Sequence, residues 1–183
     1  MGFFSKIFGH NGDKGEKHPN LEFYEEVVDN IIVSEALKSE LRIKLKQSFE
    51  NPKSFYDDKN EFILSERGLR YPKDILLTPK FVLIDTLENN DQMAEVDWKE
   101  TEEEIRSSIN RIIKAKNYSL KLNEDNRYDD TDTFEIIKSI NDKELNPLGY
   151  YLEILDINSD SYVFTVVPLD QHQVVKKIFE KLR

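Results

Sequence analysis

Apolar residues between positions 20 and 50 recur every three or four residues, which is the spacing of one face of an α-helix. They form two groups, over residues 21–32 and 37–49. Ser34 stands before the second group, where a side-chain oxygen can cap the free backbone N–H groups of a helix. Pro52 ends that group because proline disfavours helical geometry in the residue before it. This part of the chain therefore predicts two helices.

Two later helix starts carry a small polar residue followed by glutamate three positions on, the pattern of a capping box. These pairs are Thr101 with Glu104 and Asp132 with Glu135, and an isoleucine-rich series follows each of them. Asp170 is placed to cap a last helix in the same way. The helices predicted after position 70 cover residues 75–90, with Pro79 in the first turn, 101–115, 132–146 and 170–182.

The strand signals come from short runs rich in β-branched and aromatic residues. Residues 93–98 alternate between apolar and polar side chains, as a half-buried strand does. Residues 150–157 and 162–167 are joined by four short polar residues that favour a tight turn, which predicts a hairpin. The sequence thus predicts an α+β fold, with a small antiparallel sheet of at least three strands packed with about six helices.

Composition changes this picture little. At 183 residues, with 38% hydrophobic residues, the chain is long enough for one domain, which we place at residues 19–183. Cysteine is absent, which removes disulfides and thiolate metal sites and favours a cytoplasmic location. The formal net charge of −10 repels nucleic-acid phosphates and anionic lipid headgroups, so we expect no nucleic-acid partner. The same charge favours a basic protein partner, although acidity for solubility alone is the more common reason for it.

The N-terminal 18 residues differ from the rest of the chain. Four apolar residues near the start share one side of a two-turn helix, and a glycine-rich polar stretch over 9–18 follows as a flexible tether. So short a helix is marginal in water. We therefore favour packing or fraying of this segment over membrane contact, and keep it as a candidate partner contact. The four residues are Phe3, Phe4, Ile7 and Phe8.

A calcium loop is the first chemistry to test in the predicted hairpin. Asp156, Asn158 and Asp160 place oxygen atoms at alternate positions, as a calcium loop begins. The sixth position should then be glycine and is Ser161, and the twelfth should be glutamate and is Val167. We interpret these residues as turn formers, and predict no metal or other cofactor.

Two other places invite a functional interpretation. The acidic run over residues 124–132 could gather a magnesium ion in a metal-dependent hydrolase, but a solvated loop that caps a helix explains it better. Asp97-Trp98-Lys99 follows a predicted strand, where Trp98 could anchor a partner. A core tryptophan between solvated charges is the more common arrangement and is what we expect. The only histidine of the domain body, His172, has no nucleophile elbow to serve.

The Asp97-Trp98-Lys99 segment and the hairpin around Asp160-Ser161-Tyr162 together resemble a family of uncharacterised bacterial proteins, a domain of unknown function. The resemblance covers about the C-terminal half of the chain and implies no activity. A weaker likeness to small acidic immunity proteins rests on size, charge and fold class alone.

From these observations the favoured hypothesis is a non-catalytic protein-binding domain of the cytoplasm, immunity- or antitoxin-like in its narrowest form. A metal-dependent hydrolase that uses surface carboxylates is the alternative. The candidate binding residues are Asp97, Trp98, Asp156, Asp160 and Tyr162 in the body and the four apolar residues of the N-terminal segment.

Overall fold

The computed structural model describes residues 19–56, 64–123, 125, 127–128 and 132–182, and confirms the α+β prediction. The N-terminal segment, including Phe3, Phe4, Ile7 and Phe8, lies outside the described residues. None of the helices in the described ranges is long and apolar enough to cross a membrane. The regular elements are α1 (Leu21–Ile31), α2 (Glu35–Glu50), α3 (Thr78–Asn89), β1 (Ala94–Val96), α4 (Glu102–Ala115), α5 (Thr133–Ile140), β2 (Tyr150–Leu155), β3 (Tyr162–Pro168) and α6 (His172–Lys181).

Three of the predicted helix caps are present. The side chains of Ser34, Thr101 and Asp132 each accept a hydrogen bond from the backbone N–H three residues on. The backbone N–H of Thr101 donates to the carboxylate of Glu100 at 3.0 Å, where the capping-box pattern places Glu104. The predicted cap at Asp170 is wrong, because α6 starts at His172 and has no side-chain cap.

The three strands form one antiparallel sheet in the order β1-β3-β2. Tyr162 pairs with Val96 of β1 at one end of β3, and Val167 pairs with Tyr151 of β2 near the other. β2 and β3 are the predicted hairpin, and their connection has the turn chemistry expected for it. Asn158 takes the left-handed conformation at φ 55°, which asparagine tolerates better than most residues.

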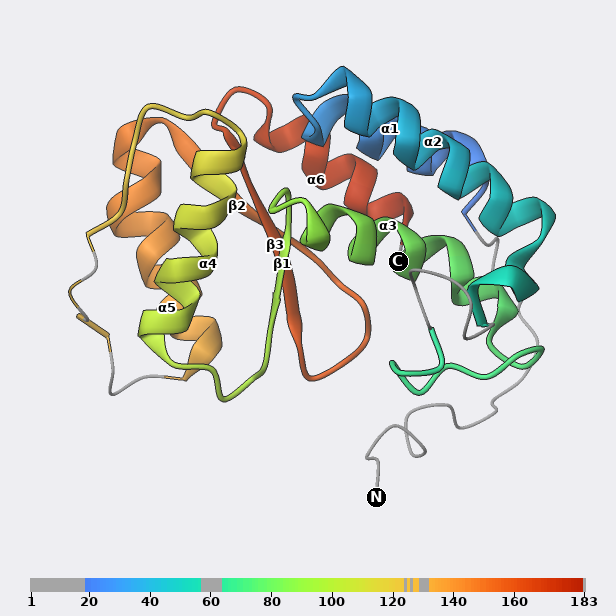
Figure 1. Ribbon diagram of the computed structural model, residues 1–183. Helices are drawn as coiled ribbons and strands as arrows, with labels where there is room; N and C mark the ends of the chain where they lie inside the picture. Colours follow the sequence, from blue (N-terminus) through green and yellow to red (C-terminus); the bar gives the residue numbers. More distant parts are fainter. Residues whose placement is uncertain (1–18, 57–63, 124, 126, 129–131, 183) are drawn as a thin grey trace.

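Helices cover both faces of this sheet, as Figure 1 shows. Leu155, Val163 and Val167 point toward α1, α2, α3 and α6, where the larger hydrophobic cluster lies. Leu152, Phe164 and Val166 point toward α4 and α5 on the opposite face. The alternation of β3 residues between two apolar faces explains why that strand is buried along most of its length and hydrophobic there except at Thr165.

A buried arginine joins α4 to the two segments beside it. Arg106 is 1% exposed and donates to Glu102 at 2.7 Å, to both carboxylate oxygens of Glu144, and to the backbone oxygen of Asn123. Glu144 belongs to a π-helical turn, Asn141–Leu145, that continues α5. The network therefore fixes the chain on both sides of α4.

A buried lysine reaches from the end of α4 to the sheet. Lys116 is 3% exposed, and its Nζ donates to the Thr165 hydroxyl at 2.7 Å and to the Val166 carbonyl at 3.0 Å. The Thr165 hydroxyl donates in turn to the backbone oxygen of Gln92 at 2.7 Å. Burial lowers the pKa of Lys116 to about 7.

Candidate functional site

The turn after β1 places Trp98 on the surface. The carbonyl of Asp97 accepts a hydrogen bond from Glu100 N at 3.0 Å, and the Asp97 carboxylate accepts one from Lys99 N at 2.9 Å. This is a β-turn with aspartate in its first position, so Trp98 occupies the outward corner. Trp98 is 48% exposed, and the expectation of a core tryptophan is therefore wrong.

The start of α5 packs beside this turn. The Thr133 hydroxyl donates to the backbone oxygen of Glu100 at 3.3 Å, which joins the N-terminus of α5 to that of α4. The next residue, Phe134, is 43% exposed and has its ring centroid 5.9 Å from that of Tyr162. Because Tyr162 pairs with Val96, one residue before Asp97, the structure brings three of the predicted binding residues together.

A hollow of about 380 Å³ lies between the two helix starts. Trp98 forms one side of it, and Thr133 and Ile136 of α5 contribute to the other. Carboxylates line the same hollow, among them Glu100 and Asp132. Positive helix N-termini favour anions. Here Asp132 caps α5, and three consecutive glutamates fill the first turn of α4, so the protein's own acids already meet that preference.

One carboxylate that lines the hollow is buried, and both of its oxygens already accept hydrogen bonds from the protein. Glu102 is 1% exposed; one of its oxygens accepts from Arg106 and the other from the backbone N–H groups of Arg127 and Tyr128. Burial opposes ionisation of Glu102, but these hydrogen bonds outweigh it and hold its pKa below the usual range. We therefore assign Glu102 to the scaffold of the hollow.

One cation of the chain already rests on the exposed tryptophan. The Lys99 Nζ lies 4.2 Å from the centroid of the Trp98 ring, in cation–π geometry. The Lys99 side chain is itself exposed. The Trp98 ring thus presents a face that accepts an ammonium group, in an acidic environment.

The other predicted residues have separate positions. Asp156 accepts a hydrogen bond from Asn158 N at 2.9 Å, which makes it a turn residue of the hairpin. Its charge also acts on Lys80 of α3, where burial lowers the lysine pKa and Asp156 partly restores it. Asp160 is exposed in the hairpin loop, two residues before Tyr162.

No group of three or more histidine, aspartate or glutamate side chains in the described parts of the chain is arranged to hold a metal ion. Positions 124, 126 and 129–131 of the acidic run lie outside those parts, so the magnesium hypothesis for this run remains a prediction.

Phe134 was not among the predicted binding residues, although the structure places its ring beside that of Tyr162. Its signal was its place in the helix pattern: Ile136, Ile137 and Ile140 share the buried face of α5, and Phe134 does not. An aromatic residue that falls outside the buried face of a helix is a candidate for surface contact.

Comparison with known proteins places this α+β protein in a family. Residues 29–183 match the model of the domain of unknown function DUF6630, and the chain belongs to that family. The resemblance to an uncharacterised family is thereby confirmed, and the match extends beyond the C-terminal half in which the resemblance lay. No curated protein and no solved structure matches the chain significantly.

Proposed function

We propose that this protein is a non-catalytic protein-binding domain that docks a basic segment of its partner on the Trp98 face. The single observation that carries the proposal is the exposed Trp98 ring, which bears a lysine ammonium group and lies among carboxylates. By the Trp98 face we mean the surface formed by Asp97, Trp98, Glu100, Asp132, Phe134 and Tyr162.

The chemistry of this face fits a lysine or arginine side chain from the partner. A cation of the partner would replace Lys99 on the Trp98 ring. This exchange keeps a cation–π contact on the ring, so it costs little interaction free energy. The carboxylates of Asp97 and Asp132 are both exposed and would face the arriving positive charge. Tryptophan is also among the residues that dominate the energetics of protein interfaces.

The expected contribution of Trp98 follows from its exposed area. A tryptophan buries about 200 Å² when fully covered. Because Trp98 is 48% exposed, covering its exposed part would remove about 100 Å² from water. At about 25 cal/mol per Å² this is worth at most about 2.5 kcal/mol, or roughly seventyfold in affinity, before the costs of association.

In its narrower form, the proposal is that this protein is immunity- or antitoxin-like. Its basic partner would then be a toxin that binds to the acidic Trp98 face. The net charge of −10 supports this form, because opposite charge accelerates the encounter of such pairs. It would be distinguished from other binding roles by the partner itself, which would lose an enzymatic activity in the complex.

The fluorescence of Trp98 gives a direct test, because it is the only tryptophan of the chain. The full chain would be titrated at low salt with hexapeptides that alternate arginine with glycine, and with glutamate–glycine peptides of equal length. We expect a saturable change in Trp98 emission with the arginine peptides alone. Asp97→Lys should weaken it by about fivefold or more, because the change removes one attraction and adds one repulsion.

Asp170→Lys is the matched control, since Asp170 is an exposed aspartate in the turn that precedes α6. It changes the net charge by the same amount and should leave the titration close to wild type. Equal weakening by both variants would show that only the overall charge matters. Equal responses to the arginine and glutamate peptides would remove the proposal.

A further inference from the structure

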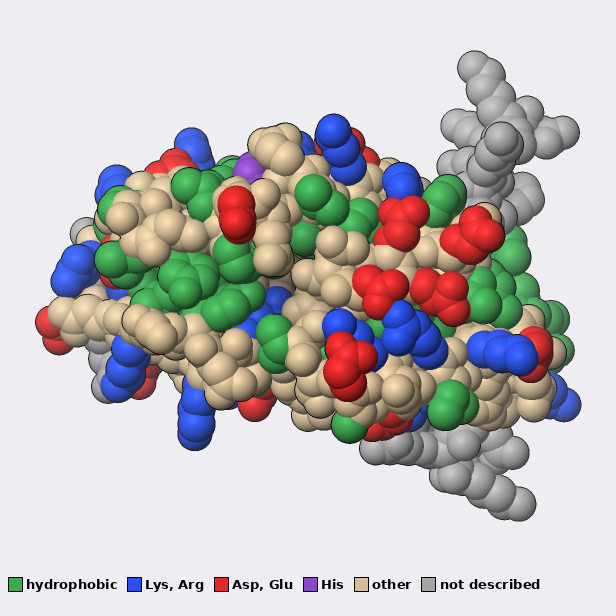
Figure 2. Space-filling view, turned by 90° about the horizontal axis from the view of Figure 1, so that it is seen from above, with side chains coloured by type: hydrophobic (Ala, Val, Ile, Leu, Met, Phe, Trp, Pro, Cys, Tyr) green, Lys and Arg blue, Asp and Glu red, His purple; other side chains and the backbone are tan. Residues whose placement is uncertain are grey.

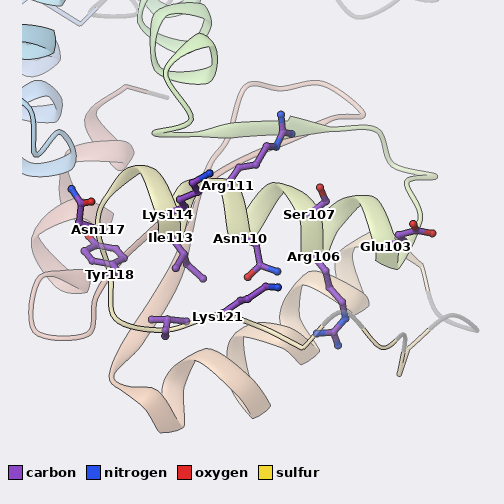
Figure 3. Close-up of a pocket in the computed structure, with 11 residues that line it drawn as sticks. Glu103, Arg106, Ser107, Asn110, Arg111, Ile113, Lys114, Asn117, Tyr118 and Lys121 are labelled. Atoms are coloured by element: carbon purple, nitrogen blue, oxygen red, sulfur yellow. The ribbon is translucent and has the colours of Figure 1, made fainter.

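A groove runs along the solvent side of α4, with a cavity volume of about 890 Å³ (Figure 3). Its helical side is a stripe of polar residues at spacings of four, three and four, so all of them share one face of α4. This stripe consists of Glu103, Ser107, Asn110 and Lys114, and Asn117 extends the lining just beyond the end of the helix. A polar face on a helix is common. This one forms a groove because a second segment of the chain lies beside it.

The second wall of the groove is the segment over residues 118–122, which returns alongside α4. The Asn110 side chain binds both backbone polar groups of Leu122 in this segment. It accepts a hydrogen bond from Leu122 N at 2.9 Å and donates one to Leu122 O at 3.3 Å. Arg106 donates to the backbone oxygen of Asn123 at 3.1 Å. The wall is therefore held in place before any ligand arrives, which lowers the entropy cost of binding.

The charge of the groove is opposite to that of the whole protein. Arg111, Lys114 and Lys121 line it and are all exposed, whereas Glu103 is the one carboxylate among the described residues of the lining. Arg111 lies 3.9 Å from Asp91, a loose pair between two half-exposed side chains. Lys114 makes no ion pair within the described part of the chain. A chain with a net charge of −10 thus presents a cationic groove.

One end of the groove is apolar. Tyr118 and Leu120 line it there, and the Tyr118 ring lies 4.8 Å from the ring of Tyr150. Beyond Tyr150 the surface continues through Leu148 and Leu169, which are 57% and 46% exposed and are brought together by the hydrogen bond from Leu169 N to Gly149 O. Figure 2 shows hydrophobic side chains gathered on this face of the molecule, over the α4 and α5 half.

We infer that this groove binds an extended acidic peptide segment of another protein, with an apolar residue of that segment seated at the Tyr118 end. The charge of the lining selects carboxylates, and the open shape along the helix suits a chain better than a compact molecule. From Glu103 to Lys114 the helix rises about 16 Å at 1.5 Å per residue. An extended peptide covers that length with about five residues at 3.3 Å each.

This site is separate from the Trp98 face and would take a partner segment of opposite charge. The inference does not rest on the proposed function, since none of the residues of the Trp98 face lines the groove. Trp98→Ala should therefore leave acidic-peptide binding unchanged, and so the two proposals can fail independently.

Fluorescence anisotropy of labelled hexapeptides would test the inference. The set would place three glutamates among leucine, tyrosine and alanine, and each member would have a counterpart with lysine in place of glutamate. We expect glutamate peptides with leucine or tyrosine at one end to bind, the lysine counterparts not to bind, and binding to weaken as salt rises. Lys114→Glu with Lys121→Glu should weaken it by about tenfold or more.

Lys177→Glu on α6 is the charge-matched control, because Lys177 is exposed and does not line the groove. It should bind as the wild type does, and far-UV circular dichroism should show that all variants are folded. Equal binding of glutamate and lysine peptides, absence of binding by every glutamate peptide, or equal weakening by Lys177→Glu would overturn the inference. So would a dimer that Lys114→Glu abolishes, because a second copy of the chain would then occupy the groove.

Discussion

Replacing Lys116 with methionine should remove a rise in stability that the wild-type protein shows as the pH increases from 7 to 9. Burial lowers the pKa of Lys116 from 10.5 to about 7 in the folded protein. Between these two values the unfolded chain binds a proton at this lysine that the folded chain does not hold. The free energy of unfolding then increases with pH, by about 1.4 kcal/mol per unit at most.

Integrated from pH 7 to pH 9, the difference amounts to about 2 kcal/mol, since Lys116 is half charged in the folded protein at pH 7. Burial lowers the pKa of Lys80 as well, so the wild-type slope alone would not isolate Lys116. The difference between wild type and Lys116→Met does isolate it. Methionine fills the same space and leaves the Thr165 to Gln92 hydrogen bond intact, although the Val166 carbonyl loses a donor.

Urea unfolding at pH 7, 8 and 9, followed by far-UV circular dichroism, gives the three free energies for each protein. Lys114→Met is the matched control, because it removes an exposed lysine from the same helix and should keep the wild-type slope. Parallel pH dependence of wild type and Lys116→Met would refute the reasoning. Lys116 would then remain charged in the folded state, with water or a counter-charge reaching it.

Three further substitutions, each with a control, test how the fold is held together. Arg106→Met leaves the buried Glu102 without its cation and should lower the free energy of unfolding, measured in urea, by about 3–5 kcal/mol. The exposed Arg111→Met should lower it by less than about 0.5 kcal/mol. Similar losses in both variants would contradict the role of the Arg106 network. Thr101→Ala should cost about 1 kcal/mol and Thr101→Ser almost nothing, and an equal loss in both would show that the hydroxyl does not cap α4. Gly149→Ala should cost about 1–2 kcal/mol because φ is +83° in open space, and Gly149→Asn should cost less; the opposite order would point to a steric cause.

The local signals in the sequence predicted most of the fold. The caps at Ser34, Thr101 and Asp132 depend on residues three positions apart, so they form wherever the helix forms. The hairpin likewise follows from two β-rich runs and a polar turn. The predicted cap at Asp170 depended on the helix starting at residue 171, whereas α6 starts at His172, whose ring contacts Glu153 at 2.9 Å and stacks on Tyr151.

The candidate site needed contacts between distant parts of the chain. Trp98 is exposed because of how the 97–100 turn leaves the sheet, and its hydrophobicity alone predicted the opposite. Phe134 belongs to this surface through the contact of its ring with that of Tyr162, on a strand distant in the sequence. Lys116 follows the end of α4, where lysine is usually exposed, yet its amine lies against Thr165, 49 residues away. The spacing of apolar residues along the sequence does not predict contacts between segments so far apart.

The most direct test of the Trp98 face is photo-crosslinking in the native host, with a photoreactive amino acid placed at position 99 and, in a second strain, at position 43. Lys99 is exposed and lies on the Trp98 ring, so this replacement keeps Trp98 itself. Ile43 is 69% exposed on α2, away from this face, and serves as the control position. We predict a crosslink from position 99 to a protein with a basic segment, absent from position 43 and lost when Trp98→Ala is added. Equal crosslinking from both positions, or none from position 99, would contradict the proposal.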